Sequence, residues 1–183
     1  MQPNTFKKSV HGRSQTPILI SGWRTPKLKV IFSNIVKPFY YPNSPQMARY
    51  SLTVVVDPIC HKEFMDKMKK MEHNENCATQ FRDEMKKDES GNPQITGNSI
   101  LKFQTKEGIP IFKMLNGQPV PYETLKELPR DTEVDVTFEV ARYTSKQTGQ
   151  NGLSCRAMQI LIHSMPEIAY KSYDAPESES APF

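Results

Sequence analysis

The chain has 183 residues and a net charge of +4, and 37% of its residues are hydrophobic and 24% charged, a balance typical of one globular domain with polar margins. No apolar run approaches the ~18 residues of a membrane helix, and no apolar segment follows the basic N-terminus as it would in a secretory signal. The composition therefore argues against a membrane protein and a secreted protein. Three cysteines without a spacing pattern predict reduced thiols and an intracellular protein.

The net charge conceals an uneven distribution along the chain. Eight cations and no anions precede Asp57, whereas residues 165–183 carry four acids and one lysine. A basic head, a near-neutral body and an acidic tail are typical of a protein that binds a polyanion and carries a competing polyanion of its own. Solvated chain ends are also often charged, so the charge pattern alone leaves both interpretations open.

In chain order we expect three parts: a basic, flexible, proline-punctuated arm over residues 1–26, a folded domain over 27–164 and an acidic, disordered tail over 165–183. At the start of the domain, β-forming residues predict one strand within 27–39, limited by Pro38, and a second strand over 48–56. The prolines between these strands predict a turn over 40–47.

A helix with a clear start follows the second strand. Asp57 is a good N-cap, and Pro58 suits the first helical position. An apolar stripe at helical spacing continues from there and consists of Cys60, Phe64, Met68 and Met71. After a break near residues 73–76, we expect residues 78–87 to resume the helix, because Phe81 and Met85 are four residues apart.

The second half of the chain has the pattern of a β-structure. Strands are expected over 99–106, 110–115, 132–145 and 152–163, joined by a loop over 88–93, a turn over 116–122 and a hairpin loop over 146–152. Strict alternation in residues 132–145 predicts that Val134, Val136, Phe138 and Val140 face inward. The same alternation predicts that Glu133, Asp135, Thr137 and Glu139 face outward on a solvated surface.

About five principal strands with one inserted helix fit a mainly β fold of the OB class, a five-stranded Greek-key barrel. Other α+β sandwiches fit the same order of elements. We therefore predict an OB-fold domain that carries a basic arm at its N-terminus and an acidic tail at its C-terminus.

The last ten residues, DAPESESAPF, are acidic and end in Pro-Phe, and in this they resemble single-stranded DNA-binding proteins of bacteria and phages. Bacterial members of that class end in an acidic tail closing with Pro-Phe, and T7-like phage members end in an acidic tail closing with Phe. The passage IFSNIVKPFYYPNSPQMARYSLTVVVDP also resembles the phage OB-fold binders in layout, as does the helix between early strands.

The resemblance implies that the tail recruits replication proteins such as a DNA polymerase or helicase and competes with DNA for a basic groove. The residues that would do so are Asp174, Glu177, Glu179, Pro182 and Phe183. An apolar ring beside its own α-carboxylate suits a pocket rimmed by Arg or Lys. The resemblance also implies a homodimer, although no residue of the sequence shows a dimer face, and it places a viral protein in the host cytoplasm.

Sequence-tolerant binding of single strands needs cations for the phosphates and aromatic rings for base stacking. The sequence interleaves both kinds of residue, and the predicted DNA-binding residues are Trp23, Arg24, Lys27, Lys29, Lys37, Tyr40, Arg49, Lys102, Phe103, Lys106, Arg142, Tyr143, Lys146 and Arg156. For Trp23, a DNA contact and a role in capping the barrel are both open. Phe103 and Phe32 fit the core as well as they fit a surface.

Other chemistry has weaker support in the sequence. Cys60, His61, His73 and Cys77 are suitable zinc ligands, but no Cys-x2-Cys pair accompanies them, and whether they bind zinc stays open. We expect no cofactor and no enzymatic activity, because the sequence has no phosphate-binding loop and no arrangement of catalytic residues.

The prediction is a sequence-independent single-stranded DNA-binding protein that coats single strands in phage DNA replication, recombination or repair. The alternatives are an annealing or RNA-binding OB module and an interaction adaptor that binds no nucleic acid, with a small hydrolase as a distant third.

Overall fold

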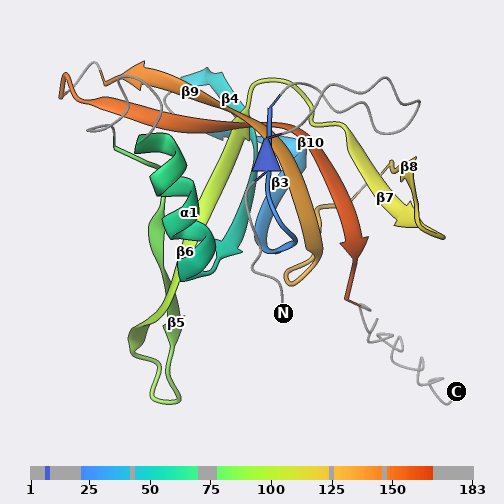
Figure 1. The fold of residues 1–183 in the computed structure, drawn as a ribbon, viewed down its shortest axis with the longest axis horizontal. Coiled ribbons are helices and arrows are strands. Elements are labelled where there is room, and N and C mark those ends of the chain that lie inside the picture. The colour runs from blue at the N-terminus through green and yellow to red at the C-terminus, as the bar shows by residue number, and fades with distance from the viewer. Residues whose placement is uncertain are drawn as a thin grey trace, which may run out of the picture.

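The computed structural model describes residues 7–8, 22–41, 44–69, 78–123, 126–145 and 148–166. Within these ranges the chain is mainly β with one helix (Figure 1). The elements are β1 (Lys7–Lys8), β2 (Trp23–Arg24), β3 (Leu28–Tyr41), β4 (Ser44–Val56), α1 (Pro58–Lys69), β5 (Arg82–Lys87), β6 (Pro93–Thr105), β7 (Ile111–Leu115), β8 (Gln118–Pro121), β9 (Glu133–Thr144) and β10 (Asn151–Ser164). In this part of the chain, no helix combines the length and the apolar character needed to cross a bilayer.

Strands β3, β4, β6, β10 and β9 form a closed ring. Each pairs with the next in that order, and the ring closes because β9 pairs with both β10 and β3. The pairing of β6 with β10 is parallel, with Cys155 opposite Phe103, and the other pairings in the ring are antiparallel. This connectivity is a five-stranded Greek-key barrel, and it confirms the predicted OB class.

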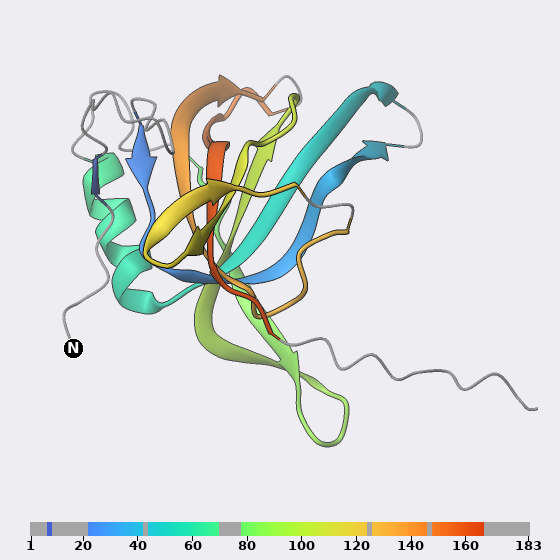
Figure 2. The same cartoon turned by 90° about the vertical axis from the view of Figure 1, so that its right-hand side faces the viewer.

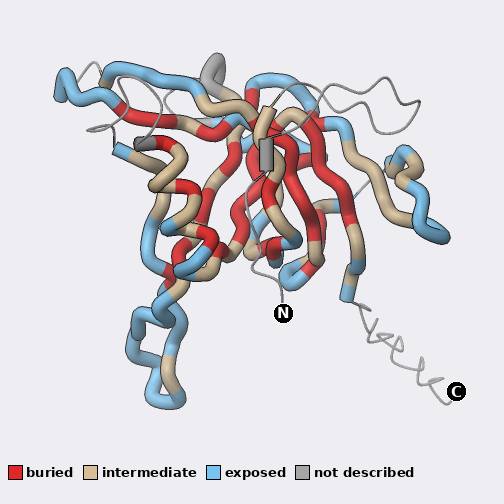
Figure 3. Tube along the Cα trace, in the orientation of Figure 1, coloured by how far each residue is buried: buried red, intermediate tan, exposed pale blue. Residues whose placement is uncertain are grey.

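The core fills the barrel and continues under α1. Phe103 and Phe138 lie 5.2 Å apart between ring centroids, and Phe64 of α1 lies 6.2 Å from Phe138. Figure 3 shows that the strands are buried where they form the barrel and exposed where hairpins leave it. Large apolar residues alternate along the barrel strands, so one face of each strand supplies the core.

Helix α1 begins as its sequence predicts. The Asp57 carboxylate accepts the backbone N–H groups of Ile59 and Cys60, both at 2.9 Å, which satisfies two free donors of the first turn. The predicted apolar stripe is buried at Cys60, Phe64 and Met68. Its last predicted member, Met71, lies outside the described residues.

Three predictions about local structure are wrong. The predicted turn over 116–122 contains strand β8, which pairs with β7. Residues 82–87 are not helical but form β5, which pairs antiparallel with β6 in a hairpin that projects from the barrel (Figure 1). Pairing with a long neighbouring strand outweighs the helical spacing of Phe81 and Met85. The predicted turn over 40–47 is also too long, because β3 continues through Pro38 to Tyr41 and β4 begins at Ser44. Figure 2 shows these two strands extending together beyond the barrel.

The outward-facing side of β9 differs from the prediction as well. Asp135 and Thr137 are buried, because β2 pairs along this part of β9. Thr25 fixes the contact, since its N–H donates to the Val136 carbonyl and its hydroxyl accepts the Val136 N–H, both at 3.0 Å. The predicted arm over residues 1–26 therefore ends in a segment that packs on the barrel.

Asp135 is the centre of a charged cluster that ties β2, β9 and β10 together. Arg24 donates two hydrogen bonds to its carboxylate, at 3.0 and 2.8 Å, and His163 Nε2 lies 2.7 Å from Asp135 Oδ2. The Asp135 side chain is only 7% exposed. Removing Asp135 would leave the largely buried His163 and the partly exposed Arg24 without their shared partner.

We expect Asp135→Ala to lower the free energy of unfolding by about 2–3 kcal/mol, because Arg24 and His163 lose their shared acceptor. Urea unfolding followed by circular dichroism measures the change. Glu139→Ala on the same strand serves as the control and should change stability by no more than about 0.5 kcal/mol. Equal losses of unfolding free energy in both variants would contradict a stabilising role of the charged cluster around Asp135.

Candidate nucleic-acid interface

The pairing registers place rows of side chains across the outer face of β3, β4 and β6. Because Leu52, Val54, Leu101 and Phe103 point into the core, the residues between them point outward. We call this surface the β4 face, and its rows are Lys29–Val55–Ile100, Phe32–Thr53–Lys102, Asn34–Ser51–Gln104 and Phe39–Arg49.

The β4 face is basic and carries no carboxylate. Its charged residues are Lys29, Lys102 and Arg49, and the small residues Ser51 and Thr53 lie buried between larger neighbours. In OB folds that bind oligonucleotides, the ligand lies on the second and third strands of the barrel and on the loops after the first and fourth strands. Here those strands are β4 and β6, and those loops join β3 to β4 and β9 to β10.

Phe32 reaches this face because of a β-bulge. Val30 pairs with Val54, but Phe32 pairs with Thr53. β3 therefore advances by two residues where β4 advances by only one. In a regular strand Phe32 would share the core-facing side of Val30. The bulge at Ile31 turns Phe32 outward instead, and its side chain is 67% exposed.

The structure separates the aromatic candidates clearly. Phe103 has no exposed surface and packs on Phe138, so the prediction that it contacts DNA is wrong. Tyr40 and Tyr143 are exposed, and so are Phe39 and Phe32, the second of which the sequence left ambiguous. An exposed ring on a strand is available for stacking on a base, whereas a core ring is not.

Tyr143 is held over a glycine of the neighbouring strand. Gly152 pairs with Tyr143 across β9 and β10, and a Cβ on Gly152 would clash with the Tyr143 ring. Covering a strand glycine with a cross-strand ring fixes the orientation of that ring. Tyr143 therefore stands in a defined position next to the loop of the β9–β10 hairpin.

Trp23 and Arg24 lie on β2 beside β9 and point to opposite sides of the sheet. Trp23 is half-buried against the core, with Lys67 of α1 5.7 Å above its ring, so the structure supports the capping role. Arg24 donates to Asp135, as described above, so most of its charge is already balanced. Neither residue lies on the β4 face.

The remaining predicted cations are distributed over several surfaces. Lys29, Arg49 and Lys102 belong to the β4 face. Arg156 is exposed on β10 and lies 3.9 Å from Glu107, a separation that gives only a weak surface ion pair. Lys27, Lys37, Lys106 and Arg142 are also exposed, and Lys146 lies outside the described residues.

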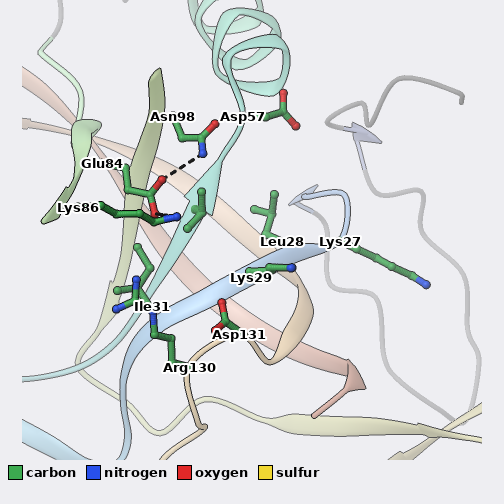
Figure 4. A pocket seen from close by; sticks show the side chains of 11 residues that line it. Lys27, Leu28, Lys29, Ile31, Asp57, Glu84, Lys86, Asn98, Arg130 and Asp131 are labelled. Atoms are coloured by element: carbon green, nitrogen blue, oxygen red, sulfur yellow. Dashed lines mark hydrogen bonds and ion pairs between the residues drawn. The ribbon is translucent and has the colours of Figure 1, made fainter. Parts of the chain in front are cut away.

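A pocket of about 430 Å³ lies at one end of the β4 face and shares Lys29 and Val55 with it (Figure 4). Its cations are Lys27, Lys29, Lys86 and Arg130, and its acids are Asp57, Glu84 and Asp131. Sequence reasoning did not find Lys86 and Arg130, because Lys86 was assigned to a helix and Arg130 has no patterned neighbours. In Figure 4 the side chain of Lys27 points away from Glu84 and Lys86.

Glu84 is not a free acid in this pocket. Burial raises its pKa, but hydrogen bonds from Thr96 at 2.6 Å and Asn98 at 3.1 Å, together with nearby Lys86, outweigh burial and hold the pKa below its usual value. Asp57 is occupied as the N-cap of α1. Two of the three pocket acids are therefore engaged within the protein.

Glu127 also lies close to the β4 face, and it was not among the site residues predicted from the sequence. Its carboxylate accepts the Ser33 hydroxyl at 2.8 Å and the N–H groups of Ile35, Val36 and Lys37 at 2.7, 3.0 and 3.2 Å. Burial raises the pKa of Glu127, but these hydrogen bonds outweigh burial and hold the pKa below its usual value. A carboxylate with several donors is stabilised in its charged form.

This lowered pKa predicts a pH dependence of stability. A group whose pKa is depressed by folding stabilises the native state above its unfolded pKa, and the effect is lost as pH falls through the folded pKa. The difference in unfolding free energy between the wild type and Glu127→Gln should therefore be constant near neutral pH and shrink below about pH 4.5. Urea unfolding of both proteins from pH 7 to pH 3 measures it, and a pH-independent difference would contradict the assignment.

The candidate zinc set is only partly described. Cys60 is buried in the core, and His61 Nδ1 lies 2.8 Å from the Ser99 hydroxyl while its ring stacks on Phe81. His73 and Cys77 lie outside the described residues. Among the residues that the structure does describe, no three potential ligands gather in one place.

The buried thiols should be chemically inert in the native protein. Burial raises the pKa of Cys60 and of Cys155 to about 12, with Asp57 adding to the effect at Cys60. Since the thiolate is the reactive form, a Cys77→Ser variant should react with Ellman's reagent only after it is unfolded. Fast reaction of one thiol per native chain would contradict this burial.

Comparison with known proteins supports the fold assignment at the level of structure. No family model and no curated protein matches the sequence. The C-terminally truncated single-stranded DNA-binding protein of bacteriophage Enc34 is 15% identical, with a TM-score of 0.62 over 88% of this chain and 97% of its own. The same phage protein in complex with single-stranded DNA is 13% identical, with a TM-score of 0.61 over 93% of this chain and 99% of its own.

The single-stranded DNA-binding protein encoded by bacteriophage T7 is 12% identical, with a TM-score of 0.54 over 87% of this chain and 97% of its own. These matches cover nearly the whole length of the phage proteins. Such low identities establish shared architecture only. The chain therefore has the mainly β OB fold, with one inserted helix, of phage single-stranded DNA-binding proteins.

Proposed function

We propose that this protein binds single-stranded DNA without sequence preference and coats it during phage DNA replication or recombination. The observation that carries the proposal is the β4 face, a basic, acid-free surface with exposed aromatic rings on the strands where OB folds bind oligonucleotides. The fold shared with phage proteins of that function supports it.

The β4 face has both components that such binding needs. Lys29, Lys102 and Arg49 contribute positive charge for the phosphate backbone, and Phe32 provides an exposed ring on which a base stacks. Stacking and backbone contacts accept any base, so the protein would bind without reading sequence. Binding should weaken steeply with salt, because each neutralised phosphate releases a counterion.

Two further surfaces extend the proposed path of the single strand beyond the β4 face. Tyr40 is exposed on β3 near the loop that leads into β4, and Tyr143 and Arg142 lie on β9 before the next loop. Both hairpins point toward the upper side of the molecule in Figures 1 and 2. Among the acids of β9, Asp135 is paired with Arg24, and Glu133 lies opposite Lys29 at the edge of the β4 face.

The acidic tail adds a second part to the proposal. Asp174, Glu177 and Glu179 would compete with DNA for the basic surface, and Pro182 and Phe183 would dock into a replication protein when DNA displaces the tail. These residues lie outside the described part of the chain, so this role depends on their sequence. A polymerase or helicase is the expected kind of partner.

The proposal is tested by fluorescence anisotropy with labelled oligo-dT, duplex DNA and RNA at several salt concentrations. Full-length protein should bind oligo-dT tightly and salt-dependently, and a version truncated after Tyr173 should bind it more tightly. Preferred binding to RNA would favour an RNA-binding module. Failure of both versions to bind at low salt would overturn the proposal and leave an adaptor whose Phe183 serves a protein partner.

A further inference from the structure

We propose that Glu127 is a positioning residue for single-strand binding: its carboxylate fixes the bend of β3 that presents Phe39 and the outer part of the β3–β4 hairpin. This inference rests on the proposed function. It concerns a residue that does not lie on the β4 face and acts through the backbone that carries that face.

The bend lies where β3 separates from β4. The two strands pair from Lys29 to Asn34 on β3, and pairing then resumes at Phe39. The intervening residues 35–38 have no partner on β4 in this register. A strand that leaves its ladder would normally have unpaired backbone donors, which are costly where water is partly excluded.

Glu127 accounts for every donor in this gap. The N–H groups of Ile35, Val36 and Lys37 all donate to its carboxylate, and the fourth residue, Pro38, has no N–H. Ile35 and Val36 bind different oxygens of the carboxylate, so the group is held in orientation as well as in place. Hydrogen bonds to an ionised acceptor are stronger than those between neutral groups.

The carboxylate is itself held in place from two sides. The Ser33 hydroxyl donates to Glu127 Oε2 at 2.8 Å and accepts the Leu128 N–H at 2.7 Å. Leu128 is buried in the core, so the segment that carries Glu127 cannot shift without exposing it. The bend of β3 is thereby attached to the barrel through a different part of the chain, more than 90 residues away.

The part of β3 beyond the bend carries a potential DNA-contacting surface. Phe39 pairs with Arg49 on the β4 face, and Tyr40 is 59% exposed. Figure 2 shows that this hairpin extends beyond the barrel, so its direction depends on the bend at its base. Holding binding groups in place before the ligand arrives reduces the entropy lost on binding.

The test is a double-mutant cycle measured with oligo-dT by fluorescence anisotropy. Glu127→Gln retains the size of the side chain but replaces acceptor oxygen with an amide donor, and we expect it to weaken binding about tenfold. Because it acts through the hairpin, it should cause little further loss in a Phe39→Ala background. Phe32 precedes the bend in the chain. In a Phe32→Ala background, Glu127→Gln should therefore still weaken binding by the full factor.

Three further measurements separate positioning from general stability. Glu123→Gln, an exposed glutamate in the same segment, should leave binding unchanged. Hydrogen exchange at Ile35, Val36 and Lys37 should accelerate in Glu127→Gln, while exchange in β9 and β10 stays as in the wild type. If Glu127→Gln does not fold, Ser33→Ala removes one support of the carboxylate, and the same pattern of coupling should appear with a smaller loss.

The outcomes distinguish this inference from the proposed function. Equal losses on Glu127→Gln in the wild-type, Phe32→Ala and Phe39→Ala backgrounds would show a general structural role and overturn the positioning inference alone. Failure of the wild-type protein to bind oligo-dT would overturn the proposed function and the inference with it. If the effect of Glu127→Gln is reduced only in the Phe39→Ala background, both the positioning inference and the proposed function are supported.

Discussion

Replacing Phe32 with alanine should weaken oligo-dT binding by about 5- to 150-fold while the protein remains folded, since stacking one base on an aromatic ring contributes about 1–3 kcal/mol. Phe32 is the most exposed of the large hydrophobic side chains in the described part of the chain, at 67%. It lies in one row with Thr53 and Lys102, so a stacked base would have a cation nearby for its phosphate.

The matched comparison is Phe103→Ala. Both phenylalanines lie on strands of the same sheet, but Phe103 has no exposed surface and contacts Phe138 in the core. Phe103→Ala should cost about 3–5 kcal/mol of stability, whereas Phe32→Ala should change it by less than about 0.5 kcal/mol. Anisotropy and urea unfolding measure the two effects, and unchanged DNA binding in a folded Phe32→Ala protein would remove the β4 face as the binding site.

The second large effect should come from reversing charge on the β4 face. The double variant Lys29→Glu, Lys102→Glu should weaken binding at ~50 mM salt by more than about a hundredfold, because two attractive contacts become repulsive. It should also reduce the slope of log affinity against log salt by about 1.4, since each lost phosphate contact on a single strand removes about 0.7. Binding measured across a salt series gives both values.

Lys87→Glu provides the control for net charge. Lys87 is exposed at the far end of the β5–β6 hairpin, where it pairs with Pro93, and it is not part of the β4 face. It should weaken binding only slightly through the overall field of the protein. Lys87→Glu changes the net charge by half as much as the double variant, so a loss of log affinity half as large would show that DNA binding depends on total charge and not on this face.

Local signals in the sequence predict the parts of the fold that depend on local chemistry. The start of α1 follows from Asp57 and Pro58, because an N-cap needs only a side-chain acceptor and a residue suited to the first turn. The core side of β9 follows from alternation, and Val134, Val136 and Phe138 are buried as predicted. The order of strands and the helix between them fits the OB class and other α+β sandwiches alike, and the resemblance of the acidic tail favoured the OB class.

Predictions about surfaces required contacts between distant parts of the chain. Asp135 alternates with the core residues of β9 and was expected in solvent, but β2, more than 100 residues earlier, covers it and supplies Arg24. Residues 82–87 have helical spacing, but pairing with β6 makes them a strand. The partner of Asp135 is far away in the sequence, so no local pattern contains it. The partner of residues 82–87 is the next strand of the chain, and the helical spacing concealed this hairpin.

The candidate binding site shows most clearly which features follow from the sequence and which follow from the tertiary structure. The sequence by itself determined the kinds of residue available: cations interleaved with aromatic rings on β-strands, followed by an acidic tail ending in Phe183. Only the tertiary structure decided that Phe32 is exposed and Phe103 buried, because one bulge at Ile31 reverses the face that Phe32 occupies. Likewise, Glu127 acquired its role only because folding brings it to the unpaired backbone of β3.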